Sequence, residues 1–138
     1  MDIGDLHNIH PANKLEVGAR LAMVALAKAF HISAKHATYS GPVFKSADFS
    51  GNQVVIEYTQ VGRRLLSRNG KPLNWFQLAG PDGKYVDAQA RIVGKTVVVQ
   101  SPEISSPTAV RFAWSDIAEP NLMNAAGLPA LPFVARKP

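Results

Sequence analysis

The spacing of apolar residues changes once along the chain. Between residues 13 and 30, apolar side chains recur every three to four positions, as they do along one face of a helix. The residues of this face are Val17, Leu21, Met23, Val24, Leu26 and Phe30. Asn13, followed three residues later by Glu16, is typical of a helix start, because the Asn side chain can accept an unpaired backbone N–H. The pattern therefore predicts a helix over residues 13–30.

The apolar face of this predicted helix is broad, which implies burial against a large surface such as a sheet. The residues that precede it in the sequence could not supply such a surface. An exposed face of this kind would leave an apolar patch that drives association. We therefore expect the helix to bury itself against the rest of the chain or against a second copy.

After His36, apolar and polar residues alternate with the period of two that is typical of strands, and tight-turn residues separate the runs. The turn signals are Ser50-Gly51-Asn52, Asn69-Gly70, Asp82-Gly83 and Gly94-Lys95. They predict two tight hairpins, over residues 47–58 and 91–100, and a last strand over residues 109–114. Several short strands at this spacing indicate a small antiparallel sandwich-like or barrel-like domain.

The last residues, 120–138, contain Pro129 and Pro132, which exclude a regular helix or a central strand there. We expect an extended segment packed along the surface. The fold class is thus mainly β, with one N-terminal helix followed by a small β-sandwich-like domain. We place this domain at residues 37–138, with its strands between about residues 38 and 118.

Composition excludes several classes of protein. The chain has 138 residues, of which 46% are hydrophobic and 18% charged, so it is not a disordered chain. No apolar run approaches the roughly 18 residues of a membrane span, the first residues show no signal-peptide pattern, and the absence of cysteine excludes disulfides and thiolate sites. The net charge is +5, but only Arg63, Arg64 and Arg68 form a basic cluster. We interpret this cluster as a solvated loop, and we expect neither nucleic-acid nor membrane binding.

The residues best suited to chemistry precede the predicted helix: Asp2, Asp5, His7 and His10. A loop histidine can act as a general base near neutral pH, and a nearby carboxylate can hold its tautomer and stabilise the imidazolium. Two other interpretations stay open. His10 can belong to the cap of the helix with His7 exposed, or His7, His10 and an Asp can form a zinc site.

Motifs in the same order along nearly the whole chain resemble those of the sialate O-acetylesterases, which belong to the serine-dependent SGNH/GDSL hydrolase superfamily. The segments that carry the resemblance are Asp2-Ile3-Gly4-Asp5, Asn8-Ile9-His10-Pro11, Asn13-Lys14, Val17-Gly18, Tyr39-Ser40-Gly41-Pro42, Gly70-Lys71-Pro72-Leu73, Trp75-Phe76, Ala79-Gly80, Ser101-Pro102-Glu103, Val110-Arg111-Phe112-Ala113-Trp114, Asn121-Leu122-Met123-Asn124 and Gly127-Leu128-Pro129-Ala130.

The resemblance implies that His10 is the catalytic general base. The superfamily's acid lies three residues before this histidine, and here that position is His7, so the orienting acid would be Asp5, with Asp2 as the alternative. A backbone carbonyl could also orient the imidazole. Residues 1–36 would then be the C-terminal end of an α/β SGNH hydrolase domain. No segment resembles the family's nucleophile turn or its oxyanion hole, so the nucleophilic serine would lie outside this chain. The chain alone would not hydrolyse acetyl esters above background.

The same resemblance names the partners of the chain. The substrate in the complete enzyme would be an O-acetylated sugar, and no cofactor or metal is implied. The apolar helix would pack on the missing N-terminal hydrolase domain, with a second copy as the alternative partner. Family membership would imply an extracytoplasmic location, periplasmic or secreted.

A second class of function is a non-catalytic β module that binds carbohydrate or braces a partner domain. Trp75 and Trp114 could then serve as platforms for sugar rings, although their alternation with apolar neighbours favours packing in the core. Arg111 could pair with a sialate carboxylate, although its position between Val110 and Phe112 favours an exposed strand residue.

Overall fold

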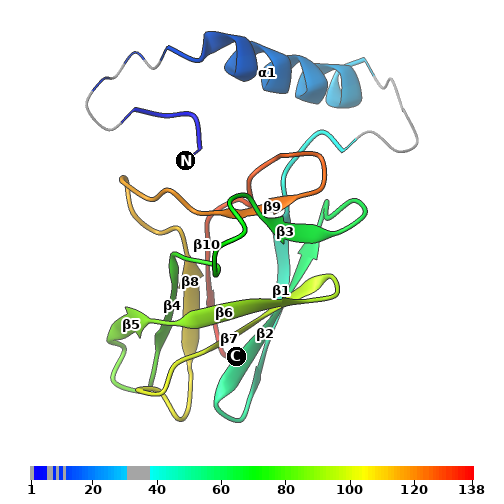
Figure 1. Ribbon diagram of the computed structural model, residues 1–138. Coiled ribbons are helices and arrows are strands. Elements are labelled where there is room, and N and C mark those ends of the chain that lie inside the picture. Colours follow the sequence, from blue (N-terminus) through cyan, green and yellow to red (C-terminus); the bar gives the residue numbers. More distant parts are fainter. Residues whose placement is uncertain (1, 6–7, 9, 11, 31–37) are drawn as a thin grey trace.

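In the computed structural model, which describes residues 2–5, 8, 10, 12–30 and 38–138, the chain forms one helix and an all-β region (Figure 1). We call the described residues up to Phe30 the N-terminal arm and residues 38–138 the β body. The single helix, α1, spans Lys14–Lys28. The Asn13 side chain accepts a hydrogen bond from the backbone N–H of Glu16 at 3.2 Å, so the predicted start of the helix is confirmed. This helix is too short and polar to cross a membrane, and no other helix occurs among the described residues.

The β body contains ten strands, all paired antiparallel. Their bounds are β1 Val43–Ser50, β2 Gln53–Thr59, β3 Leu65–Ser67, β4 Phe76–Ala79, β5 Tyr85–Asp87, β6 Gln89–Val93, β7 Thr96–Gln100, β8 Ala109–Phe112, β9 Leu122–Asn124 and β10 Phe133–Arg136. One four-stranded sheet has the order β1-β2-β7-β6 and the other β10-β8-β4-β5, while β3 and β9 form a separate pair. The predicted mainly-β fold class with one N-terminal helix is therefore confirmed.

The two predicted hairpins are present as β1–β2 and β6–β7. Their turns place Gly51 at φ 60° and Gly94 at φ 61°, in the left-handed region that glycine adopts without steric penalty. The strands between the turns alternate as the sequence pattern requires, with Val54 and Ile56 of β2 fully buried and Glu57 exposed. Turn chemistry and alternation together set the register of both hairpins.

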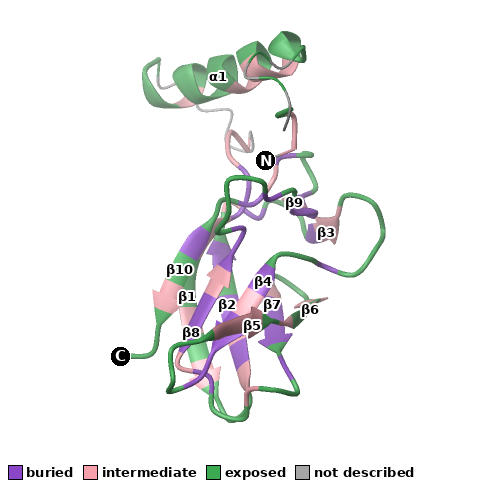
Figure 2. Ribbon diagram, turned by 90° about the vertical axis from the view of Figure 1, so that its left-hand side faces the viewer, coloured by how far each residue is buried: buried purple, intermediate pink, exposed green. Residues whose placement is uncertain are grey.

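The core lies between the two four-stranded sheets (Figure 2). The first sheet supplies Val54, Ile56, Val97 and Val99, and the second supplies Phe76, Leu78, Val110 and Phe112. The rings of Phe76 and Phe112 are 4.5 Å apart between centroids, and Phe133 of β10 packs beside Phe112 at 6.1 Å. The residues of both sheets form one hydrophobic cluster, so the β body has a complete core of its own.

Two expectations about the end of the chain are wrong. The strand over residues 109–112 is not the last, because β9 and β10 follow it, and the strands extend to residue 136 rather than to about 118. The tail is also partly buried rather than laid on the surface, with Leu122 and Ala130 fully buried. Pro129 and Pro132 lie between these strands, and β10 is an edge strand, where proline nearby does not interrupt a ladder.

The helix packs differently from the expectation. No residue of α1 is buried, Leu21 is 66% exposed, and Phe30, just beyond the helix, is 68% exposed. Figure 2 shows α1 as an exposed element beyond one end of the β body. Burial of the apolar face against the β body, one of the two expected outcomes, does not occur in the single chain.

Candidate functional site

Within the N-terminal arm, an ion pair joins the first residues to α1. The Arg20 guanidinium donates two hydrogen bonds to the Asp2 carboxylate, at 2.8 and 2.7 Å, and a third to Glu16 at 2.9 Å. The Asp2 side chain is only 11% exposed. Hydrogen bonds from Arg20 lower the pKa of Asp2 although partial burial opposes them, and the same bonds raise the pKa of Arg20. Both carboxylate oxygens of Asp2 are thus occupied by Arg20.

Two weaker contacts join the arm to the β body. The Arg68 guanidinium donates to the backbone carbonyl of Asp2 at 3.5 Å, and the Lys28 ammonium lies 5.1 Å from the centroid of the Tyr39 ring. Arg68 is otherwise exposed, as are Arg63 and Arg64, in keeping with a solvated basic loop. These contacts hold the start of the chain near the end of the β body that carries β3 and β9 (Figure 1).

His10 is exposed and lies between this fastened segment and the helix. Its backbone N–H donates to the Asn8 side chain at 2.9 Å, which is a local turn that sets the course of the chain before Asn13. Asp5 is also exposed and takes part in an interaction of its own. The structure thus places Asp2, Asp5 and His10 in one short segment, while the role of Asp5 as the orienting acid stays a prediction.

His7 lies outside the described residues, and the zinc interpretation depends on it. Within the part of the chain that the structure describes, no three His, Asp or Glu side chains gather into a group that could hold a metal ion. The other open interpretation places His10 in the cap of the helix. The side chain that caps the helix is instead that of Asn13. The chemistry that the described residues offer here is proton transfer by an exposed imidazole.

The prediction that the two tryptophans pack in the core is wrong. Trp75 is 36% exposed and Trp114 is 59% exposed. The alternation fails because both lie just outside strands β4 and β8, where the backbone turns into the left-handed region: Trp75 has φ 63° and Ala113 has φ 51°. A hydrogen bond from the Ala113 N–H to the Trp75 carbonyl, 2.9 Å long, joins these two turning points.

Arg111 is half-buried and held on the outer side of the second sheet. Its Nε donates to the Gln77 side chain at 2.7 Å, and its guanidinium lies over the Tyr85 ring, 4.0 Å from the centroid. Gln77 in turn donates to Asp87 at 2.8 Å. These partners hold Arg111 in a network across β8, β4 and β5, which supports its interpretation as a strand residue rather than a ligand for sialate.

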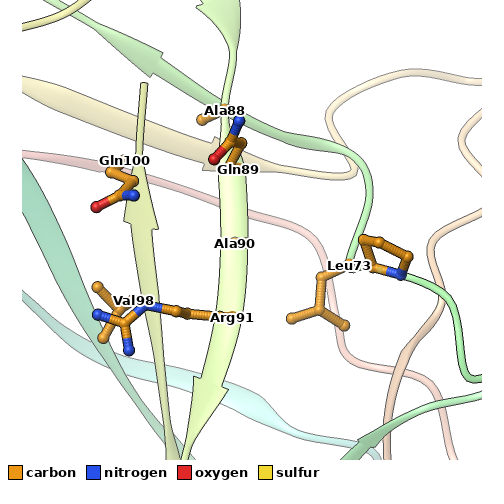
Figure 3. A pocket seen from close by; sticks show the side chains of 8 residues that line it. Leu73, Ala88, Gln89, Ala90, Arg91, Val98 and Gln100 are labelled. Carbon is orange, nitrogen blue, oxygen red and sulfur yellow. The ribbon is translucent and has the colours of Figure 1, made fainter. Parts of the chain in front are cut away.

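The hollows of the β body include two that differ in their lining. The first, of about 600 Å³, lies at the ends of β8 and β10 and is lined by Ala113, Trp114, Ser115, Asp116 and Pro132. The second, of about 450 Å³, lies over β6 and β7 and is lined by Pro72, Leu73, Ala88, Gln89, Ala90, Arg91, Val98 and Gln100 (Figure 3). The first combines an aromatic ring with a carboxylate and a hydroxyl. The second has amide and guanidinium groups but no aromatic side chain.

Two buried asparagines organise the end of the β body that faces the arm. Asn124 is fully buried; its amide donates to the carbonyls of Ser40 and Gln60, at 2.9 and 3.0 Å, and its oxygen accepts from two backbone N–H groups. Asn121 donates to the Pro72 carbonyl at 2.9 Å and exchanges hydrogen bonds with Asn74. In the sequence, both asparagines stand out only as part of the family resemblance. Polar residues amid the apolar positions of the tail were the signal that could have marked them as buried.

Comparisons with known proteins find a similar enzyme among the solved structures. No protein-family model matches the chain, and no curated protein matches it. Among solved structures, the chain is similar to a carbohydrate acetylesterase from Xanthomonas citri, with 39% sequence identity and a TM-score of 0.89. The similarity covers 97% of this chain and 31% of that one, so the chain spans about a third of the length of the enzyme that it matches.

Proposed function

We propose that this chain is the C-terminal part of a serine-dependent carbohydrate O-acetylesterase, whose nucleophilic serine lies outside residues 1–138. The observation that carries the proposal is the match of 97% of the chain to a carbohydrate acetylesterase at 39% identity. Identity at this level over both the arm and the β body supports more than a common fold. The sequence motifs extend the proposal to the sialate O-acetylesterase type and to an extracytoplasmic location.

In the proposed mechanism, the serine hydroxyl attacks the carbonyl carbon of the acetyl group. His10 takes the serine proton and returns it to the departing sugar oxygen, which leaves an acetyl-serine intermediate. His10 then takes a proton from water as the water attacks the acetyl-serine carbonyl, and gives that proton to the serine as acetate leaves. Asp5 would hold the imidazole in the tautomer that accepts the proton. The exposure of His10 in the chain alone suits this role, because the imidazole is open to a partner on another domain.

The exposed apolar face of α1 supports the same division of the chain. We assign residues 1–36 to the end of the hydrolase domain and residues 37–138 to the β domain that follows it. Leu21, Val24 and Leu26 are each more than 40% exposed, so each would gain part of the roughly 1.5–3 kcal/mol that burial of a fully exposed side chain of this kind supplies. Packing of α1 against the sheet of a hydrolase domain would supply that burial, and packing against a second copy is the alternative.

A second candidate, a non-catalytic module that binds carbohydrate or braces a partner domain, is favoured by the exposed Trp75 and Trp114. The two candidates differ in whether His10 is needed for turnover. A chimaera in which residues 1–138 replace the matched region of the Xanthomonas citri acetylesterase separates them. We expect this chimaera to hydrolyse an activated acetyl ester and an O-acetylated sugar, and the 138-residue chain alone to stay near background.

The matched variants are His10→Ala and Lys95→Ala in the chimaera. Loss of His10 should reduce turnover by about 10³-fold or more, because the serine then lacks its base, whereas Lys95→Ala changes only an exposed side chain in the β6–β7 turn. A His10→Ala chimaera that folds and retains its turnover would refute the catalytic assignment and leave the non-catalytic module as the function. A chain that alone hydrolyses the ester, with a serine labelled by an organophosphonate, would refute the proposed external nucleophile.

A further inference from the structure

We propose that Trp75 and Trp114, together with the hollow beside Trp114, form a binding surface for a neutral glycan chain. The choice of a carbohydrate ligand rests on the proposed function; the surface itself rests on the geometry of the β body. It lies where three neighbouring strands, β10, β8 and β4, end side by side. Pro132, Ala113 and Trp75 stand at these three ends, because Phe112 pairs with both Phe133 and Phe76.

The backbone at this edge is arranged to turn the two indoles outward. Trp75 and Ala113 both adopt the left-handed conformation, which is unfavourable for residues with a Cβ atom and most unusual for a bulky one. Such residues cost on the order of 1–3 kcal/mol each, persist only where the surroundings impose them, and gather at ligand sites. Here they face each other across the strand pair and are joined by the 2.9 Å hydrogen bond between Ala113 and Trp75. The strained backbone at Trp75 and Ala113 therefore leaves two tryptophans exposed at one edge of the sheet.

The segments that carry the indoles are fixed before any ligand binds. Asn74, next to Trp75, exchanges backbone-to-side-chain hydrogen bonds with Asn121, at 3.2 and 2.9 Å, and donates to the Glu119 carbonyl at 3.4 Å. Asn121 is 2% exposed. The loop from Trp114 to Asn121 is thus tied at its far end to the residue that precedes Trp75. A pre-ordered pair of aromatic residues loses little conformational entropy on binding.

The chemistry of the edge matches a sugar ring. Within the described part of the chain, neither indole takes part in a ring contact, a cation contact or a side-chain hydrogen bond. Trp75, 36% exposed, and Trp114, 59% exposed, each present part of their surface to a ligand. The C–H face of a pyranose can lie on such a ring, and its hydroxyls need donors and acceptors beside the ring. The hollow supplies the Asp116 carboxylate and the Ser115 hydroxyl next to Trp114. A purely apolar docking patch would not need them.

Local charge selects a neutral sugar. Asp116 lines the hollow and Glu119 lies exposed on the same loop, whereas no Lys, Arg or His lines the hollow among the described residues. A sialate carboxylate at this surface would meet like charges without a cation to pair with it. Segment 113–121 also lies at the end of the β body that faces the N-terminal arm (Figure 1). A neutral part of the glycan would be held here, while the acetylated sugar, a sialate in the proposed substrate type, reacts at the catalytic site.

The test uses the 138-residue chain labelled with ¹⁵N and a titration with xylohexaose as the neutral glycan, free and O-acetylated. The chain has two tryptophans, so its two indole N–H signals report on the surface directly. We expect both signals to shift with one saturation curve. Trp114→Ala should weaken binding at least tenfold, Trp114→Phe should weaken it less, and Val93→Ala, which trims an equally apolar exposed residue on the β6–β7 hairpin, should leave it unchanged.

Several results would overturn the inference. Indole signals that do not move on addition of the glycan would overturn it, whether or not signals near Arg91 in the second hollow shift. Equal affinity of 3′-sialyllactose would overturn the preference for a neutral glycan. Indole signals that do not respond to sugars but shift in the chimaera would show that this edge of the sheet contacts a protein domain. The titration is repeated on the His10→Ala chain, because glycan binding at the tryptophans does not depend on catalysis. An inactive chimaera refutes the proposed function alone. Indole signals that do not move during the titration refute this inference alone.

Discussion

The β body and the N-terminal arm use apolar residues in opposite ways. In the β body, Phe76, Phe112 and Ile56 are at most 1% exposed, and the two sheets enclose them. In α1, the apolar face is present and the start of the helix is capped, yet none of its residues is buried. Among the described residues, an ion pair joins the first residues of the arm to α1, and one hydrogen bond to a backbone carbonyl and one cation–ring contact join the arm to the β body. The difference shows that a well-formed, capped helix can leave its apolar face exposed.

This contrast separates folding from function within the chain. The β body can fold on its own core, whereas the arm carries the histidine that we propose as catalytic. Most helical stability in proteins comes from packing of the apolar face rather than from the helix itself. We therefore propose that the arm reaches its working state only when its apolar face is covered, and the predictions below test that proposal.

The largest expected effect concerns Asp5, which we propose as the orienting acid of His10. In the chimaera, Asp5→Asn should reduce kcat by about 10⁴-fold, because the imidazole would be held in the wrong tautomer. Steady-state kinetics on the two Asp variants checks this. Near-native turnover by Asp5→Asn, with a large loss in Asp2→Asn, would move the role to Asp2. Turnover unaffected by either change would mean a Ser-His dyad without an acid.

Truncation of an apolar side chain should lower the stability of the chain strongly in the β body and only slightly in the arm. Phe112→Ala removes a ring in contact with Phe76 and Phe133 and should lower the free energy of unfolding by about 3–5 kcal/mol. Leu21→Ala removes an exposed side chain and should change it by less than about 0.5 kcal/mol. Urea unfolding of the 138-residue chain measures both. An equally large loss in Leu21→Ala would show that the helix is already packed in solution.

The smallest effect is the dependence of the arm on pH. Arg20 lowers the pKa of Asp2, so the ion pair stabilises the fastened arm fully above the pKa of an unfolded Asp, about 4, and the stabilisation is lost as pH falls through the lower pKa of the folded state. NMR titration of the Asp2 carboxyl should give a midpoint below 4, and Arg20→Ala should raise it. An unchanged midpoint in Arg20→Ala would show that another group holds Asp2.

Local rules predicted the features of the fold that depend on neighbouring residues. Asn13 marked the start of α1, and Gly51 and Gly94 marked the two hairpins, because capping and tight turns are decided within four residues. Strands β9 and β10 were missed because each has only three or four residues and its partner is distant in sequence: Leu66 pairs with Met123, and Val110 with Ala135. Pairing of this kind leaves little trace in the local pattern.

The candidate site was predictable to a different extent. His and Asp side chains before a helix carry recognisable chemistry, so the sequence singles out the residues of the arm, and their catalytic role stays a prediction. The exposure of Trp75 and Trp114 was missed because it depends on left-handed backbone at Trp75 and Ala113, which alternation cannot reveal. Asn121 and Asn124 were missed as structural residues because their partners are backbone carbonyls 49 to 84 positions away.

Amide hydrogen exchange along α1, compared between the 138-residue chain and the chimaera, tests the central claim most directly. In the chain alone, we expect the amides of β2 and β7 to be strongly protected and those of α1 to exchange quickly, because only global unfolding exposes the core strands. In the chimaera, protection of α1 should rise by at least about 100-fold as its apolar face is covered, while β2 and β7 stay unchanged. Equal protection of α1 and the core strands in the chain alone would contradict the account, as would an α1 that stays unprotected in an active chimaera.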